Sequence, residues 1–201
     1  MPWIIDYHAV VEQMRGQRFK SLYYHSGAFG FADDSGTSVV GWTTGADPTI
    51  RESARASVVT VNPPTVDSLV TLLTKIWREH LPGRVWLMPA SHWAFELEYG
   101  SADWLPAVLE NVGVDPGLLV GRNNASAIEF APNESAAFAH VTARLLEMLA
   151  SSDFTIAFPG RQVVCMVHHH KQLWWTTTVT DLATTLRQAA EPAPPMSDSA
   201  G

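Results

Sequence analysis

The most informative part of the sequence, residues 163–178, reads Val-Val-Cys-Met-Val-His-His-His-Lys-Gln-Leu-Trp-Trp-Thr-Thr-Thr. Its first five residues are all apolar, which is typical of a central β-strand that is covered on both faces. The polar run from His168 to Gln172 separates this strand from a second one that begins at Leu173. We therefore predict a β-hairpin with a polar tip inside a sheet.

Further strands are predicted in clusters that turn residues separate. Phe154 to Phe158 precedes the hairpin across Pro159-Gly160, a typical turn sequence. His92 to Tyr99 alternates between two kinds of side chain, with Trp93, Phe95, Leu97 and Tyr99 on one face, as a half-exposed strand does. Shorter apolar segments predict strands at residues 22–24, 29–31, 39–42 and 84–87.

Several segments carry apolar residues at helical spacing. The fullest stripe runs from Val66 to Trp77, with Thr65 as N-cap and Pro82-Gly83 as the end. Asn133 is predicted to cap the helix that extends to Leu149, and Asp103 the helix that extends to Val112. Other helices are predicted at residues 7–14 after Asp6, near Asp47-Pro48, and from Thr178 or Thr180 to Leu186.

Helices that alternate with hairpins, rather than with single strands, favour an α+β fold with a mostly antiparallel sheet. Residues 65–112 and 134–190 share a similar order of elements, so two weakly similar α-β-β-α halves are a further hypothesis. Residues 1–190 contain no linker-like stretch and are predicted to form one domain. Residues 191–201, which are rich in proline and small residues, are predicted to be a disordered tail.

Composition excludes several classes of protein. The chain has 201 residues, of which 46% are hydrophobic and 16% charged, with a net charge of −7. It is too apolar for a disordered chain, and its acidity argues against a nucleic-acid partner. No apolar run reaches the roughly 18 residues of a membrane span, so no membrane partner is expected. The N-terminus lacks the features of a secretory signal, which predicts a cytoplasmic location.

A single cysteine, Cys165, excludes an internal disulfide. Cys165 lies within the apolar run from Val163 to Val167. Because nothing nearby in the sequence would lower the pKa of its thiol, we expect Cys165 to be buried and unreactive.

Three consecutive histidines, His168 to His170, are the most distinctive polar feature. On a strand, His168 and His170 would point to one side and His169 to the other. Two imidazoles on one face could begin a zinc site, which needs at least one further ligand. His168 and His170 are therefore the candidate metal ligands, and a polar hairpin tip without a metal is the alternative.

Eight tryptophans make the aromatic content suggestive of a binding surface. Trp174 and Trp175 are adjacent on a predicted strand, so their indoles should point to opposite faces. Trp86 lies in a similar apolar segment. Exposed aromatic residues with few neighbouring charges are typical of binding surfaces and subunit interfaces. Trp86, Trp174 and Trp175 are therefore the candidate binding residues, and burial in the core is the alternative.

The sequence contains no motif of known catalytic mechanism, and no catalytic residue is predicted. Glu96 and Glu98 share one strand face at a spacing near that of some glycosidase carboxylates, but adjacent glutamates are also common on solvated strands. The glycines at 27 and 30 are not followed by Gly-Lys-Ser/Thr, so turns explain them better than a phosphate loop.

Three hypotheses about function follow. The favoured one is a non-enzymatic binding module that self-associates, or binds a protein partner, through an aromatic surface of low charge. The second is a metal-dependent hydrolase that uses His168 and His170. The third is a carrier that holds a small ligand in an aromatic-lined pocket. A divalent metal under the second hypothesis is the only cofactor considered.

Overall fold

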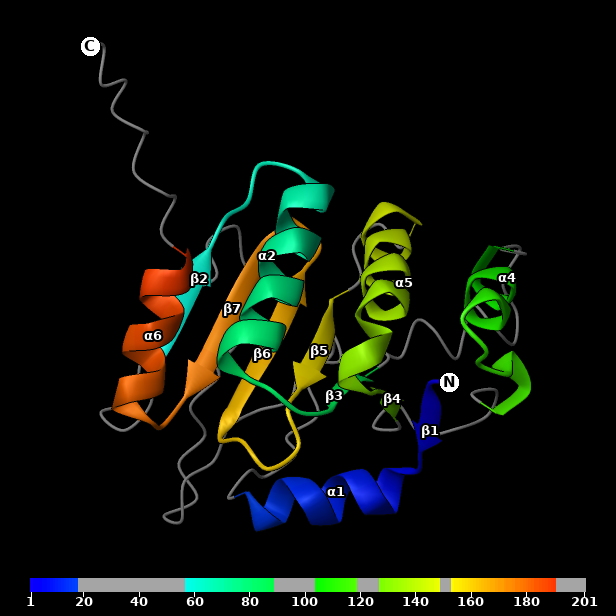
Figure 1. Cartoon of the computed structure of the whole chain (residues 1–201), viewed down its shortest axis with the longest axis horizontal. Helices are drawn as coiled ribbons and strands as arrows, with labels where there is room; N and C mark the ends of the chain where they lie inside the picture. Colours follow the sequence, from blue (N-terminus) through cyan, green and yellow to red (C-terminus); the bar gives the residue numbers. More distant parts are fainter. Residues whose placement is uncertain (18–56, 89–103, 119–126, 149–152, 191–201) are drawn as a thin grey trace.

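The structure, a computed structural model, describes residues 1–17, 57–88, 104–118, 127–148 and 153–190 (Figure 1). Several predictions lie outside these residues. They are the strands at 22–24, 29–31, 39–42 and 92–99, the helix near Asp47, the Asp103 cap, the pair Glu96 and Glu98, the glycines at 27 and 30, and the tail from 191 to 201.

One antiparallel sheet of seven strands organises the described residues, with the order β1-β4-β3-β5-β6-β7-β2. Together with the helices, this sheet confirms the predicted α+β class. The strands are β1 (Trp3–Ile5), β2 (Ser57–Val61), β3 (Val85–Met88), β4 (Ala127–Phe130), β5 (Phe154–Ala157), β6 (Val163–His168) and β7 (Gln172–Thr177).

Three consecutive strands, β5, β6 and β7, form a meander at the centre of this sheet. All residues of β5 and β6 are buried. The predicted central hairpin is thus confirmed. The apolar run of β6 is continuous because both faces of the strand are covered. Strands β1, β2 and β4 were not predicted, although four of the five residues of β2 are β-branched.

Helices cover both faces of the sheet. Helices α2 (Val66–His80), α5 (Ser135–Met148) and α6 (Thr180–Ala190) lie on one face, and α1 (Tyr7–Gly16) crosses the other (Figure 1). Helix α4 (Trp104–Asn111) lies beyond the β1 edge in the same view. Among the described residues, no helix is long and apolar enough to cross a membrane.

The ends of helix α2 follow local sequence signals. The Thr65 hydroxyl accepts a hydrogen bond from the Ser68 backbone N–H at 3.1 Å, and the Ser68 hydroxyl accepts one from the Thr65 N–H at 3.0 Å. These bonds satisfy N–H groups that have no partner inside the helix. The helix ends before Pro82-Gly83, where Gly83 takes a φ of 129°. Both predicted boundaries are therefore confirmed.

The start of helix α5 differs from the prediction. Asn133 lies inside a short 3-10 turn, Pro132–Glu134, and the α-helix begins at Ser135. The Glu134 carboxylate, rather than Asn133, reaches back to accept a hydrogen bond from the Ala131 N–H at 2.8 Å. Proline favours a tight turn at a helix start, which moves the first α-helical residue one position along the chain, from Glu134 to Ser135.

The strand register places buried side chains on both faces of the sheet, in two separate groups. Leu87, Ile156, Cys165 and Trp175 pair in turn across β3, β5, β6 and β7 and are fully buried beneath the helices. On the opposite face, Val10 and Met14 of α1 pack with a second group of buried residues. This group consists of Trp86, Met88, Ala127, Ala157 and Val164.

The buried thiol of Cys165 agrees with the sequence-based expectation. The side chain is fully buried, and burial raises the pKa of the thiol well above its ordinary value. A thiol that is kept protonated and inaccessible is a poor nucleophile and a poor metal ligand. Cys165 therefore acts as a small apolar residue in the row beneath the helices.

Candidate metal centre at the β6–β7 hairpin

The turn between β6 and β7 determines where the three histidines lie. His168 ends β6 and pairs with Gln172, so His169, His170 and Lys171 form the turn. Lys171 donates its backbone N–H to the His168 carbonyl at 2.9 Å, and its φ is 63°. Three-residue hairpin turns commonly place their last residue in this left-handed conformation.

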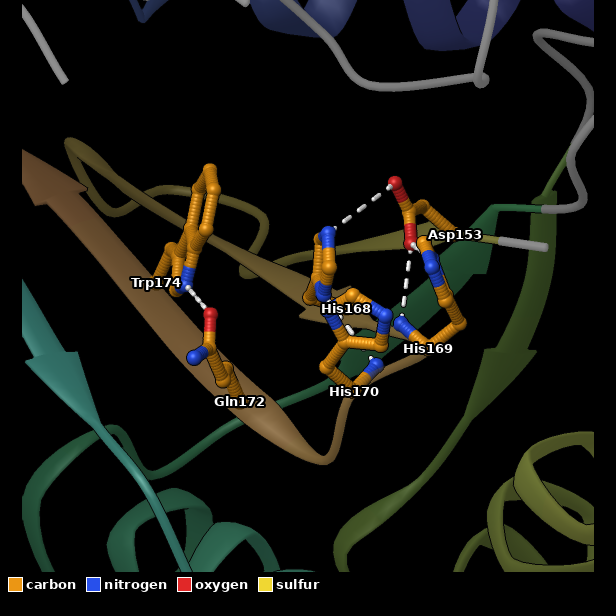
Figure 2. Close-up of polar contacts among 6 residues, drawn as sticks. All are labelled: Asp153, His168, His169, His170, Gln172 and Trp174. Carbon is orange, nitrogen blue, oxygen red and sulfur yellow. Dashed lines mark hydrogen bonds and ion pairs between the residues drawn. The ribbon is translucent and has the colours of Figure 1, made fainter. Parts of the chain in front are cut away.

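The predicted alternation of the three histidines is wrong, because only His168 belongs to the strand. The turn gathers all three rings instead of sending His169 to the opposite side (Figure 2). The ring centroids of His168 and His169 are 4.2 Å apart, those of His169 and His170 4.2 Å, and those of His168 and His170 4.8 Å.

These three side chains form a possible ligand set for a metal ion. One nitrogen from each ring lies within 4.8 Å of the others. His168 is buried, His169 is half-buried and His170 is exposed, so the set runs from the core to the surface. In the described part of the chain, no other three His, Cys, Asp or Glu residues are grouped in this way.

Asp153, which the sequence analysis did not single out, holds this group in place. It comes directly before β5, and its side chain is only 3% exposed. Its Oδ1 accepts hydrogen bonds from the His169 backbone N–H at 2.9 Å and from His169 Nδ1 at 2.8 Å (Figure 2). A buried carboxylate requires such partners, because removing a charge from water is costly.

Hydrogen bonds define which ring nitrogens carry protons. Because Asp153 accepts from His169 Nδ1, that nitrogen is protonated, and Nε2 of a neutral His169 carries the lone pair. Nδ1 of His168 accepts from the His170 backbone N–H at 3.1 Å, so the proton of neutral His168 lies on Nε2. That Nε2 is 4.0 Å from Asp153 Oδ2.

Electrostatics keep His168 neutral at physiological pH. Burial lowers the pKa of His168 to about 4, an effect that the charge of Asp153 opposes and that His169 and His170 reinforce. A histidine must be neutral to donate a lone pair to a metal. The environment therefore removes the competition from protons that weakens histidine ligands near their ordinary pKa.

Trp174 packs against His168, the most buried histidine of the cluster. Its ring lies parallel to that of His168, with centroids 5.0 Å apart and an interplanar angle of 9°. Its Nε1 donates a hydrogen bond at 2.9 Å to Oε1 of Gln172, the residue that pairs with His168 where β7 begins (Figure 2). The indole thus restricts the rotation of the most buried histidine.

The three candidate binding tryptophans do not form an exposed surface. Trp86 and Trp174 are each 5% exposed, and Trp175 is fully buried. Trp86 donates its Nε1 hydrogen to Glu129 Oε2 at 2.8 Å, while Trp175 stacks on Phe158 with centroids 5.7 Å apart. The alternative of burial in the core is therefore the correct one for these indoles.

Among the described residues, the large indole that remains exposed is Trp3, at 69%. It lies on the edge strand β1, where it pairs with Glu129 of β4. Its exposure is that of a single side chain on a short strand.

Comparison with known proteins gives no family for this chain. No family model, no curated protein and no solved structure matches it.

Proposed function

We propose that this protein binds a divalent transition-metal ion, with zinc as the first candidate, through the imidazoles of His168, His169 and His170. The observation that carries the proposal is the hydrogen bond from His169 Nδ1 to the buried Asp153. Histidines that bind metals commonly donate their second nitrogen to a carboxylate in this way. The bond leaves the other nitrogen of His169 available as a ligand.

Charge balance supports the same proposal. Asp153 is buried, and in the described part of the chain its ion-pair partners are His168 and His169 rather than a lysine or arginine. One of these two partners, His168, is neutral at physiological pH because burial lowers its pKa to about 4. A divalent ion bound to His169 would place positive charge close to the Asp153 side chain, an attraction that favours binding.

The donor chemistry selects the class of metal. Three imidazole nitrogens suit zinc, copper and nickel, whereas calcium and magnesium prefer oxygen ligands. Tetrahedral zinc, with Zn–N distances near 2.0–2.1 Å, requires its nitrogens to be about 3.4 Å apart. The nitrogens of the cluster lie within 4.8 Å of one another, so binding requires the rings to move closer together. His168 must also release the hydrogen bond that its Nδ1 accepts from the His170 backbone N–H, because that nitrogen carries its lone pair.

Calorimetric titration of zinc chloride into the full chain without a polyhistidine tag tests the proposal. We expect one zinc ion per chain, and His169→Ala should weaken binding by about tenfold or more. His140 is exposed on helix α5, away from the hairpin, so His140→Ala serves as the matched control and should bind normally. Absence of saturable binding, or equal losses in both variants, would overturn the proposal.

The other functional hypotheses stay predictions. Trp86, Trp174 and Trp175, from which self-association or a protein partner was predicted, are buried, while self-association and a protein partner themselves stay predictions. The hydrolase hypothesis shares the metal site, but a bound metal alone does not imply a reaction. The cytoplasmic location also stays a prediction.

A further inference from the structure

A hollow lies on the helical side of the sheet, between α2 and α5. Its volume is about 520 Å³, and it is lined by residues of both helices. Ligand pockets commonly have volumes of about 300–1,000 Å³. Ala139 is the residue of α5 that lines it, and such a small side chain leaves space that a larger one would fill.

The rim of the hollow carries positive charge. Lys75 and Arg78, one helical turn apart on α2, both line it and are exposed. Neither makes an ion pair with another residue of the described ranges. Glu79 also lines the rim, and its carboxylate lies 4.0 Å from His80. Two cations therefore face one carboxylate here, in a protein whose net charge is −7.

The apolar part of the lining consists of Val70 and Ala139, beside the hydroxyl groups of Thr71 and Thr74. Val70 is buried and lines it beside Ala139. Thr74 also lines it, and its Oγ1 is buried without a hydrogen-bond partner in the described structure.

We propose that this hollow binds a small amphiphilic carboxylate, with the carboxylate between Lys75 and Arg78 and an aliphatic body against Val70 and Ala139. These two cations, which form no ion pair with another described residue, specify the charge of the head group, since an anion placed there gains charge-assisted hydrogen bonds. The apolar wall specifies the body, since burial of its methylene groups favours binding. The site is separate from the histidine cluster and does not depend on the proposed metal.

Titration of sodium decanoate, followed by amide chemical shifts of the full chain, tests this inference. Saturable shifts are expected in α2 from Val70 to Glu79 and around Ala139 in α5. Decylamine, which has the opposite charge, should cause no saturable shift there. Inorganic phosphate that binds as well as decanoate, shifts confined to other elements, or no saturable shift would each overturn the proposal.

Matched variants separate the head-group contact from the apolar contact. The double variant K75E/R78E should weaken decanoate binding by about tenfold or more, because it replaces two attractions with repulsions. R187E makes the same type of change on the exposed side of α6 and should leave affinity unchanged. E79Q should strengthen binding.

Ala139→Leu fills the hollow and should abolish decanoate binding while the melting temperature stays close to that of the original chain. If Ala139→Leu does not fold, K75Q/R78Q provides the second test, and unchanged affinity in that folded variant overturns the proposal.

Discussion

The indole of Trp174 lies flat against the imidazole of His168, with ring centroids 5.0 Å apart and planes 9° from parallel. This contact joins the proposed metal centre to the buried face of β7, because Trp174 is 5% exposed. It also places an intrinsic fluorophore beside a proposed ligand, so that events at the hairpin tip should be visible in tryptophan emission.

Nickel or copper binding should therefore quench tryptophan fluorescence, since both ions quench a nearby indole efficiently. Trp174→Phe should remove most of this quenching while leaving the affinity for the ion within about threefold. Trp77 is also buried but belongs to α2, so Trp77→Phe is the control and should retain the quenching. Equal quenching in the original chain and in Trp174→Phe would contradict a metal at this hairpin.

Replacing Asp153 with asparagine should weaken zinc binding by about 10–100-fold without removing the three ligands. Asparagine preserves the size of the side chain and can still accept a hydrogen bond from His169, but it lacks the negative charge. Calorimetric titration of zinc provides the affinity. An unchanged affinity would show that Asp153 supports the hairpin only and has no effect on the ligands.

Acid should destabilise the fold through His168. The native pKa of about 4 lies below the ordinary value of 6.5, so between these pH values the unfolded chain binds more protons than the native one. The free energy of unfolding therefore falls as the pH is lowered through 6.5, by at most about 3 kcal/mol, and this contribution levels off below pH 4. In the described part of the chain, the charges of Asp153, His169 and His170 act on His168.

Urea denaturation across this pH range, in the metal-free protein, measures the effect. His168→Gln cannot titrate, so its stability should depend less on pH over the same interval. Parallel curves for the original chain and His168→Gln would show that other groups control the acid response.

Lys171→Gly should stabilise the hairpin. Lys171 is the described non-glycine residue with a positive φ, 63°, a conformation in which its Cβ is crowded. Glycine removes this crowding but increases the freedom of the unfolded chain, so we expect a net gain of about 0.5–1 kcal/mol. Lys171→Ala keeps the Cβ and is the control, which should show no gain in urea denaturation. A loss of stability in Lys171→Gly would contradict the turn geometry.

Two buried tryptophans should respond differently to replacement by phenylalanine. Trp77 Nε1 donates a hydrogen bond to the Gly83 carbonyl at 3.0 Å, whereas Trp175 Nε1 has no partner in the described structure. Both changes leave space in the core, but only Trp77→Phe also removes a hydrogen bond. Its cost in unfolding free energy should exceed that of Trp175→Phe by about 1 kcal/mol, as measured by urea denaturation. Equal losses would indicate that cavity formation outweighs the hydrogen bond.

Local patterns were sufficient to predict the β5–β6–β7 meander, helix α2 and the α+β class. The signals behind these predictions are local. The continuous apolar run forms β6 itself, and the Thr65 cap lies at the first turn of α2. Strand β1 has only three residues, too few for a periodic pattern to be distinguished from chance. In the case of β2, the β-branched residues were a usable signal that periodicity alone did not capture.

The amino-acid sequence by itself determined that a polar, histidine-rich turn would separate two apolar strands. Only the tertiary structure decided that Asp153, sixteen residues before His169, would meet it, because the register of β5 against β6 brings them together. It also decided that Trp86, Trp174 and Trp175 would be buried, because helices cover both faces of the sheet. Side-chain alternation along a strand depends on neighbouring residues, whereas strand register and helix coverage depend on contacts between residues far apart in the chain.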